Sequence, residues 1–194
     1  QFIENTDLKN ITLFCQDWGG LIGLRLAAKY SDRFEKIVAA NTGLPTGKAP
    51  LSEGFAVFRE FLQIKPDLHV AGQVRNGTTK GIDENALAAY NAPFPDDDHK
   101  QGVRQFPNLV PGTPRTPSAE PNKEAWKILR EWEKPFLCAF SDKDPIFSGV
   151  ENSFYKLIPG CKDMPHVTIE NAGHFLQEDQ PNACVEAILS IKDI

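Results

Sequence analysis

The residues at the end of the first apolar stretch could support nucleophilic chemistry by a carboxylate. The apolar residues 11–15 are followed by Gln-Asp-Trp-Gly-Gly at 16–20, and helical spacing of leucines begins directly afterwards. This order is typical of a nucleophile elbow, a strained strand-to-helix turn that requires small residues two positions before and after the displayed side chain. Cys15 and Gly19 meet that requirement, so Asp17 is the candidate nucleophile.

An aspartate displayed in this way can attack a saturated carbon and form an ester with the protein, and no proton has to be removed first. Water must then hydrolyse the ester, which calls for a histidine base held in one tautomer by a second carboxylate. The expected order along the chain is nucleophile, acid, histidine. Alternatively Asp17 only caps the helix that begins there, but capping does not explain the Trp-Gly-Gly that follows.

Two later loops supply the acid and the histidine in that order. Residues 135–140 read as a buried strand, and the loop that leaves it contains Asp142 and Asp144. Residues 166–169 read as a last short strand, and His174 lies in the glycine-flanked loop after it. Because catalytic groups collect at the carboxyl ends of parallel strands, we expect Asp144 to orient the base His174. Asp142 remains the alternative acid.

The other three histidines are weaker candidates for the base. His69 and His99 lie in polar, irregular stretches, and His166 opens the last predicted strand. We therefore expect solvated or structural roles for these side chains.

The pattern of apolar residues divides the chain into an α/β core and an inserted cap. Strand character is found in residues 1–45 and 134–194, including a strand at 36–40. Between them, residues 46–133 are rich in Pro and Gly and contain amphipathic helices, for example at 51–64. Such an insertion between strands of a parallel sheet commonly roofs an active site and excludes water.

Composition indicates one ordinary globular core, with 41% hydrophobic and 24% charged residues. The balance of 21 basic and 26 acidic residues gives a net charge of -5, which disfavours nucleic acid as a partner. The apolar runs are far shorter than a membrane span. The 4 cysteines have no metal-ligand spacing and read as free thiols of a reducing compartment. We therefore expect a cytoplasmic protein that needs no metal or other cofactor.

Four stretches of the sequence resemble haloalkane dehalogenases: residues 16–20, 89–96, 102–107 and 171–178. The Asp-Trp-Gly-Gly motif is shared with epoxide hydrolases, whereas the two stretches from the cap are much more specific. The similarity runs through nearly the whole chain and indicates the subfamily in which the cap supplies one halide-binding residue. It implies an α/β-hydrolase fold with a helical cap inserted between strands of the sheet.

The resemblance also implies how a halide is held. Asp17 would be the alkylated nucleophile and Trp18 a halide ligand, because an indole N–H is a donor without acceptor character. Phe58 stands where related enzymes carry a second halide-binding tryptophan, and a phenyl edge interacts more weakly with a halide than an N–H does. Trp126 and Trp132 are six residues apart on a predicted helix at the end of the cap, and we expect them to be packing residues.

An apolar substrate pocket is a further implication of the resemblance. Its walls would be Phe55, Phe106, Pro107, Val110 and Ile146. Each of these could also be plain core, but together they suit a small halogenated hydrocarbon, with water as the second reactant.

Two features of the sequence leave other hypotheses open. Epoxide hydrolases use two cap tyrosines to protonate the opening ring, whereas Tyr90 is the only tyrosine of this cap. Epoxide hydrolysis is therefore kept as the second hypothesis, behind haloalkane hydrolysis. Residue 1 is Gln and the strand of the nucleophile follows at once, so we expect the preceding strands and the oxyanion-hole loop to be missing and this fragment alone to be inactive. With Phe58, this motivates a third hypothesis, a non-catalytic or truncated relative.

Overall fold

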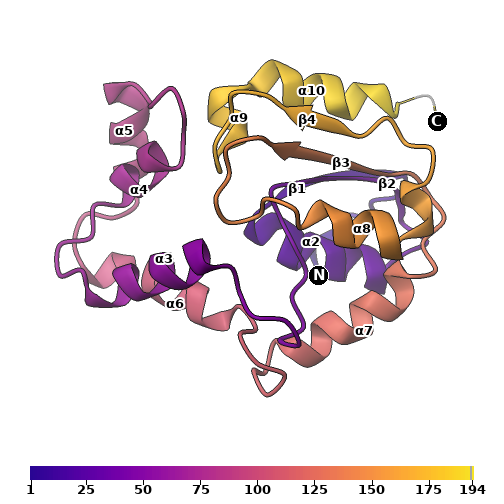
Figure 1. Cartoon of the computed structure of the whole chain (residues 1–194), viewed down its shortest axis with the longest axis horizontal. Coiled ribbons are helices and arrows are strands. Elements are labelled where there is room, and N and C mark those ends of the chain that lie inside the picture. Colours follow the sequence, from indigo (N-terminus) through magenta and orange to yellow (C-terminus); the bar gives the residue numbers. More distant parts are fainter. Residues whose placement is uncertain (193) are drawn as a thin grey trace.

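A four-stranded parallel sheet forms the centre of the molecule (Figure 1). The computed structural model describes residues 1–192 and 194. The strands are β1 (Ile11–Gln16), β2 (Phe34–Ala40), β3 (Phe136–Ser141) and β4 (Val167–Ile169), in the spatial order β1-β2-β3-β4. All four strands predicted from the sequence are confirmed, with bounds that shift by one or two residues.

Alternate residues of the strands face two different layers of helices. Phe136, Cys138 and Phe140 of β3 belong to one apolar core and Leu137 and Ala139 to the other, as the two-residue period of a strand requires. The first face is covered by α2 (Trp18–Lys29), α7 (Ala119–Leu129) and α8 (Glu151–Leu157), and the second by α10 (Pro181–Ser190). Burial on both faces explains why the strands read as continuous apolar runs.

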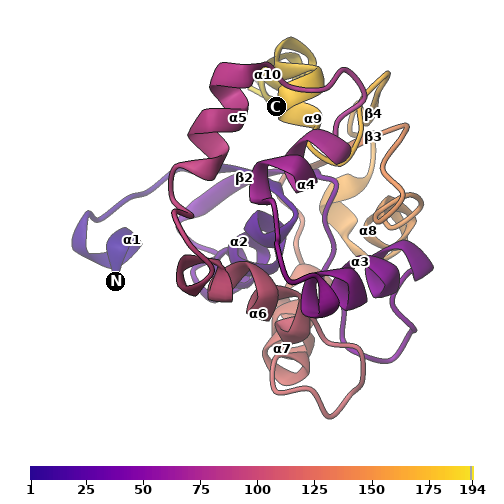
Figure 2. The same cartoon turned by 90° about the vertical axis from the view of Figure 1, so that its left-hand side faces the viewer.

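Four helices form a separate layer beside the carboxyl ends of the strands (Figure 2). They are α3 (Glu53–Ile64), α4 (Val70–Asn76), α5 (Glu84–Asn91) and α6 (Gln101–Leu109). Helix α3 packs against α6 and α4 against α5, and Leu62, Leu68 and Val70 form a small apolar core of their own. The hydroxyl of Ser52 accepts a hydrogen bond from the N–H of Phe55 and so fixes the start of α3.

Helix α7 packs against α2, on the face of the sheet, although it lies within the predicted cap range 46–133. Pro121 lies in its first turn, where a missing N–H removes no helical hydrogen bond. Trp132 follows the end of this helix and is only 4% exposed, and the indole N–H of Trp126 donates to the carbonyl O of Leu44 at 2.8 Å. Both side chains pack in the core, as predicted.

Short elements complete the chain: α1 (Phe2–Asn5), η1 (Asp98–Lys100), η2 (Pro159–Cys161) and α9 (Leu176–Asp179). The cysteines are buried free thiols. Throughout the described part of the chain, every helix is too short or too polar to cross a lipid bilayer.

Candidate active site

Asp17 lies in the turn between β1 and α2, in a backbone conformation that few residues other than glycine adopt (φ 49°, ψ -120°). Its N–H donates to the carbonyl O of Asn41 at 3.0 Å, and its carbonyl O accepts from the Thr42 hydroxyl at 2.7 Å. Such conformations cost roughly 1–3 kcal/mol and persist where the surrounding structure enforces them. The residues that follow β2 therefore hold the strained turn in place.

The tightest packing of this turn is at Gly20. A Cβ atom at Gly19 would lie 3.8 Å from the Cβ atom of Cys15, which is an ordinary contact, whereas a Cβ atom at Gly20 would lie 2.6 Å from that of Thr42. A Cβ atom, and so an alanine, fits at position 19, which is consistent with the small residue predicted there. The glycine that the turn requires is the next one.

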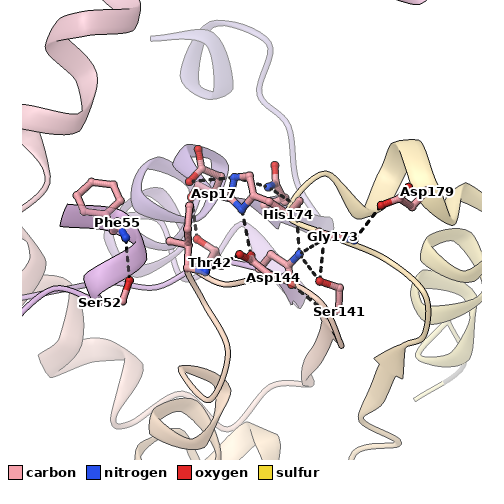
Figure 3. Close-up of polar contacts among 12 residues, drawn as sticks. Asp17, Thr42, Ser52, Phe55, Ser141, Asp144, Gly173, His174 and Asp179 are labelled. Atoms are coloured by element: carbon pink, nitrogen blue, oxygen red, sulfur yellow. Dashed lines mark hydrogen bonds and ion pairs between the residues drawn. The ribbon is translucent and has the colours of Figure 1, made fainter. Parts of the chain in front are cut away.

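His174 and Asp144 come together from the loops that follow β4 and β3 (Figure 3). The distance from His174 Nδ1 to Asp144 Oδ2 is 3.0 Å, and Asp144 Oδ1 accepts from the N–H of Ile146 at 2.8 Å. Both side chains are buried, with exposed fractions of 9% for His174 and 3% for Asp144. Because a carboxylate only accepts, Nδ1 carries the imidazole proton and Nε2 is left as an acceptor.

Asp142 makes its contacts elsewhere. Its Oδ1 accepts from the N–H of Ala172 at 3.2 Å, and its Oδ2 lies 3.0 Å from the Lys143 ammonium. The hydrogen bond from Lys143 holds the pKa of Asp142 below its usual value. Of the two aspartates in this loop, Asp144 is the one that contacts the imidazole.

Asp17 lies on the side of the imidazole opposite Asp144, and its Oδ1 is 3.7 Å from His174 Nε2 (Figure 3). Burial raises the pKa of Asp17, against the opposing effects of the His174 charge and of a hydrogen bond from the backbone N–H of Trp18. For His174, burial favours the neutral form, but the hydrogen bond to Asp144 and the charges of Asp17 and Asp144 outweigh it and raise the pKa. The charge of Asp17 thus influences when His174 can act as a base.

Two amide side chains hold the histidine loop without belonging to a recognisable motif. Asn41 is fully buried, and its Nδ2 donates to the carbonyl O atoms of Gly173 and His174 at 3.0 and 3.1 Å, while its Oδ1 accepts from the N–H of Ser141 at 2.9 Å. Gln16 Nε2 lies 3.0 Å from the carbonyl O of His174 and 3.3 Å from its Nε2. The one sequence signal for both residues is a polar side chain at the carboxyl end of a buried strand.

A cavity of about 620 Å³ opens beside Asp17 and His174. Six of the residues named from the sequence as pocket or halide-site residues line it: Trp18, Phe55, Phe58, Phe106, Pro107 and Ile146. Val110 is buried at the end of α6 and is not among the lining residues. Phe94 lies in the stretch 89–96 but is not among the pocket residues expected from the sequence, and it adds another aromatic wall.

Trp18 is the one of the three tryptophans that lines the cavity. Its ring packs edge-on against Phe106, with ring centroids 4.7 Å apart. Within residues 1–192 and 194, its indole N–H donates to no protein acceptor, in contrast to that of Trp126. A donor at the wall of an apolar cavity is therefore available to a ligand.

The remaining histidines have roles outside the cavity. His69 caps α4, with its Nδ1 accepting from the N–H of Gly72 at 3.0 Å. His166 Nδ1 accepts from the N–H of Cys138 at 3.0 Å, and His99 pairs with an exposed aspartate on the surface. These solvated and structural roles agree with those expected from the sequence.

The parallel sheet, the strained aspartate turn, and the acid and histidine after successive strands define an α/β-hydrolase arrangement. Residues 1–181 match the family described as alpha/beta hydrolase fold, and the chain belongs to this family.

Within this fold, the chain is similar to haloalkane dehalogenases, as predicted from the four stretches. It is 53% identical over 178 residues to that of Psychrobacter cryohalolentis, which covers 92% of the chain and 59% of the relative. It is 43% identical over 191 residues to haloalkane dehalogenase 1 of Mycobacterium tuberculosis, covering 97% of the chain and 63% of the relative. The solved tetrameric haloalkane dehalogenase DpaA of Paraglaciecola agarilytica superposes with a TM-score of 0.89 at 33% identity, covering 100% of the chain and 64% of DpaA. The chain thus spans less than two thirds of these relatives.

Proposed function

We propose that this protein hydrolyses carbon–halogen bonds of small haloalkanes through an ester on Asp17. The observation that carries the proposal is the meeting of Asp17, Trp18 and His174 at one cavity with aromatic walls. The similarity to bacterial haloalkane dehalogenases supports it. The overall reaction consumes a haloalkane and water and yields an alcohol, a halide ion and a proton.

The first step is the attack of an Asp17 carboxylate oxygen on the carbon that bears the halogen. The new C–O bond forms as the carbon–halogen bond breaks, and the halide leaves with the bonding electrons. The indole N–H of Trp18 donates to the halide as its charge develops, and such an interaction is strong in an apolar site. Phe58 lines the same cavity and offers only the positive edge of its ring.

The second step is the attack of water on the ester carbonyl carbon of Asp17. His174 Nε2 accepts a proton from this water, and Asp144 stabilises the imidazolium that forms. The backbone N–H of Trp18, which hydrogen-bonds the Asp17 carboxylate, is placed to stabilise the developing oxyanion. As this intermediate collapses, the imidazolium protonates the leaving alkoxide and the alcohol is released. The carboxyl group left on Asp17 then loses its proton to solvent, which restores the carboxylate.

Alkylation of Asp17 prepares His174 for this second step. The negative charge of Asp17 is one of the factors that raise the pKa of His174. Formation of the ester removes that charge, so the pKa falls and a larger fraction of the imidazole is neutral when a base is needed.

The cavity favours apolar substrates of modest size. Its volume of about 620 Å³ lies within the range of small-molecule sites, and phenylalanines from α3 and α6 form much of its wall. Haloalkanes fit this chemistry, since they need one nucleophile and one halide donor and few other polar partners.

Epoxide hydrolysis is the second candidate and has less support. The hydroxyl of Tyr90 donates to Glu178 Oε1 at 2.6 Å and is not among the groups that line the cavity. Burial, together with the hydrogen bond to Glu178 and its charge, raises the pKa of Tyr90 to about 12. A phenol engaged outside the cavity is poorly placed to protonate an opening ring.

We also infer that the protein works in a reducing compartment, the cytoplasm, because four buried thiols persist there without oxidation. Titration of the unfolded protein with a thiol reagent should find four free thiols. Fewer would indicate disulfides and contradict this inference.

The test of the proposed activity is halide release by the full-length protein from a panel of short bromoalkanes. We expect release well above that of Asp17→Ala. Release no greater than this control would contradict the proposal, and diol formation from styrene oxide would favour the epoxide alternative. Bromide binding without turnover would indicate a non-catalytic relative.

A further inference from the structure

The layer that contains α3, α4, α5 and α6, called the cap layer below, has one segment that lies directly against the loop that carries His174. Residues 77–80 follow α4, and three of them, Gly77, Thr78 and Thr79, line the cavity. The N–H of Phe175 donates to the carbonyl O of Gly77 at 3.1 Å. A Cβ atom at Gly173 would collide with that same carbonyl O, so the two backbones are as close as glycine permits.

One buried carboxylate joins these two segments. Asp179, at the end of α9, is 1% exposed. Its Oδ2 accepts from the N–H of Gly173 at 2.8 Å (Figure 3). Its two oxygens also accept from the N–H of Thr79, at 2.9 and 3.0 Å. Its Oδ1 also accepts from the N–H of Lys80 at 3.0 Å.

The charge of Asp179 is matched to this role. Burial disfavours the carboxylate, but the hydrogen bonds from the N–H groups of Gly173, Lys80 and Thr79 outweigh it and hold the pKa of Asp179 below its usual value. Hydrogen bonds to an ionised acceptor are roughly twice as strong as those between neutral groups. No other side chain in the described residues accepts backbone N–H groups from both segments.

A second contact between the cap layer and the same short helix lies next to it. The hydroxyl of Tyr90, in α5, donates to Glu178 Oε1 at 2.6 Å, and the Lys80 ammonium donates to the carbonyl O of Asp179 at 2.6 Å. Consecutive acidic residues of α9 therefore bind two different parts of the cap layer.

We propose that Asp179 is a positioning residue for the base: it fixes the peptide between Ala172 and Gly173, one residue before His174, and ties the cap wall of the cavity to it. This inference rests on the proposed function. Asp144 holds the imidazole at Nδ1, and Asn41 and Gln16 hold the carbonyl O atoms of the loop. The bond from the N–H of Gly173 to Asp179 fixes the other side of this loop backbone, and so helps to set where Nε2 stands relative to the ester on Asp17.

This role concerns one step of the reaction more than the other. The turn of Asp17 is held by Asn41 and Thr42, which make no hydrogen bond to Asp179. Loss of the Asp179 charge should therefore leave ester formation nearly unchanged and slow ester hydrolysis. Misplacement of a catalytic group by about 1 Å costs on the order of 100-fold in rate.

The test uses Asp179→Asn in the full-length protein, with rapid-mixing measurement of bromide release. We expect a burst of bromide at a rate close to that of the unaltered protein, then steady turnover about 10- to 100-fold slower. The alkyl ester should accumulate, and mass spectrometry should find it on Asp17. The matched control is Asp163→Asn, at an exposed turn residue outside the cavity lining, which should behave like the unaltered protein.

The burst amplitude counts competent sites, so partial unfolding does not obscure the result. Equal slowing of burst and steady phases, or no accumulated ester, would overturn the inference. If Asp179→Asn yields no folded protein, the test uses Asp179→Glu, which keeps the charge but shifts its position. A normal burst followed by slowed steady turnover supports the inference there too, and equal slowing of both phases overturns it. Failure of the unaltered protein to release bromide, in either phase, would contradict the proposed function instead.

Discussion

His174 Nε2 lies 3.7 Å from Asp17 Oδ1, too far for a hydrogen bond, while its Nδ1 lies 3.0 Å from Asp144. One imidazole thus stands between two carboxylates, held by one and facing the other. Asp17 loses its charge when the ester forms in the proposed reaction, whereas Asp144 keeps its charge. This asymmetry leads to the first prediction.

The base should titrate at a lower pH in the ester intermediate than in the free protein. A base works in its neutral form, so hydrolysis is lost as pH falls through the pKa of His174. That pKa is raised in the free protein partly by the charge of Asp17, which the ester lacks. NMR titration of His174 gives its pKa in the free protein, and the pH dependence of single-turnover alcohol formation gives its pKa in the ester intermediate. Equal midpoints would contradict the prediction.

Trp18→Phe should slow the burst of halide release by roughly 10- to 150-fold, because a hydrogen bond to a charged group contributes about 1.5–3 kcal/mol. The ring stays in place against Phe106 and only the N–H is lost. The matched control is Trp126→Phe, whose N–H bonds the carbonyl O of Leu44. It should lower the free energy of unfolding by about 1 kcal/mol and leave the burst unchanged. Similar kinetics for the two variants would count against Trp18 as the halide donor.

Phe58→Trp should strengthen halide binding, because it adds an N–H donor to the wall of the cavity that Asp17 and Trp18 also line. Quenching of tryptophan fluorescence by bromide measures the affinity. Val57→Trp provides the control, since Val57 is the preceding residue of α3 and is 62% exposed. If both variants bind bromide equally well, Phe58 does not face the halide site.

Asp144→Asn should reduce steady turnover on the order of 10³- to 10⁴-fold, because an amide can no longer stabilise the imidazolium or fix its tautomer. Asp142→Asn should stay near the unaltered rate, since Asp142 bonds Ala172 and Lys143. Halide-release assays on both variants decide between the two aspartates. A larger loss from Asp142→Asn would reverse the assignment.

Much of the fold follows from local patterns. The elbow needs only a strand, a tight turn and a helix in sequence, and all three are contiguous between Ile11 and Lys29. The loops of Asp144 and His174 were predictable for the same reason, since each follows directly after an apolar strand. The choice between Asp142 and Asp144 was weaker, because it depends on the path of the loop backbone.

Residues whose partners are remote in sequence were not predictable. Asn41 bonds Ser141, 100 residues away, and Asp179 bonds Lys80, 99 residues away. A buried amide or carboxylate in isolation looks like any surface residue, because its burial depends on tertiary packing. The need for Gly20 was missed likewise, since its neighbour Thr42 follows a different strand.

The ester on Asp17 is tested most directly by one turnover in H₂¹⁸O with the full-length protein in excess over a bromoalkane. If water attacks the ester carbonyl, the product alcohol carries ¹⁶O from Asp17 and the Asp17 carboxylate takes up ¹⁸O. Mass spectrometry of the alcohol and of the peptide that contains Asp17 reads both. An ¹⁸O-labelled alcohol with unlabelled Asp17 would mean direct displacement by water and would contradict the ester mechanism.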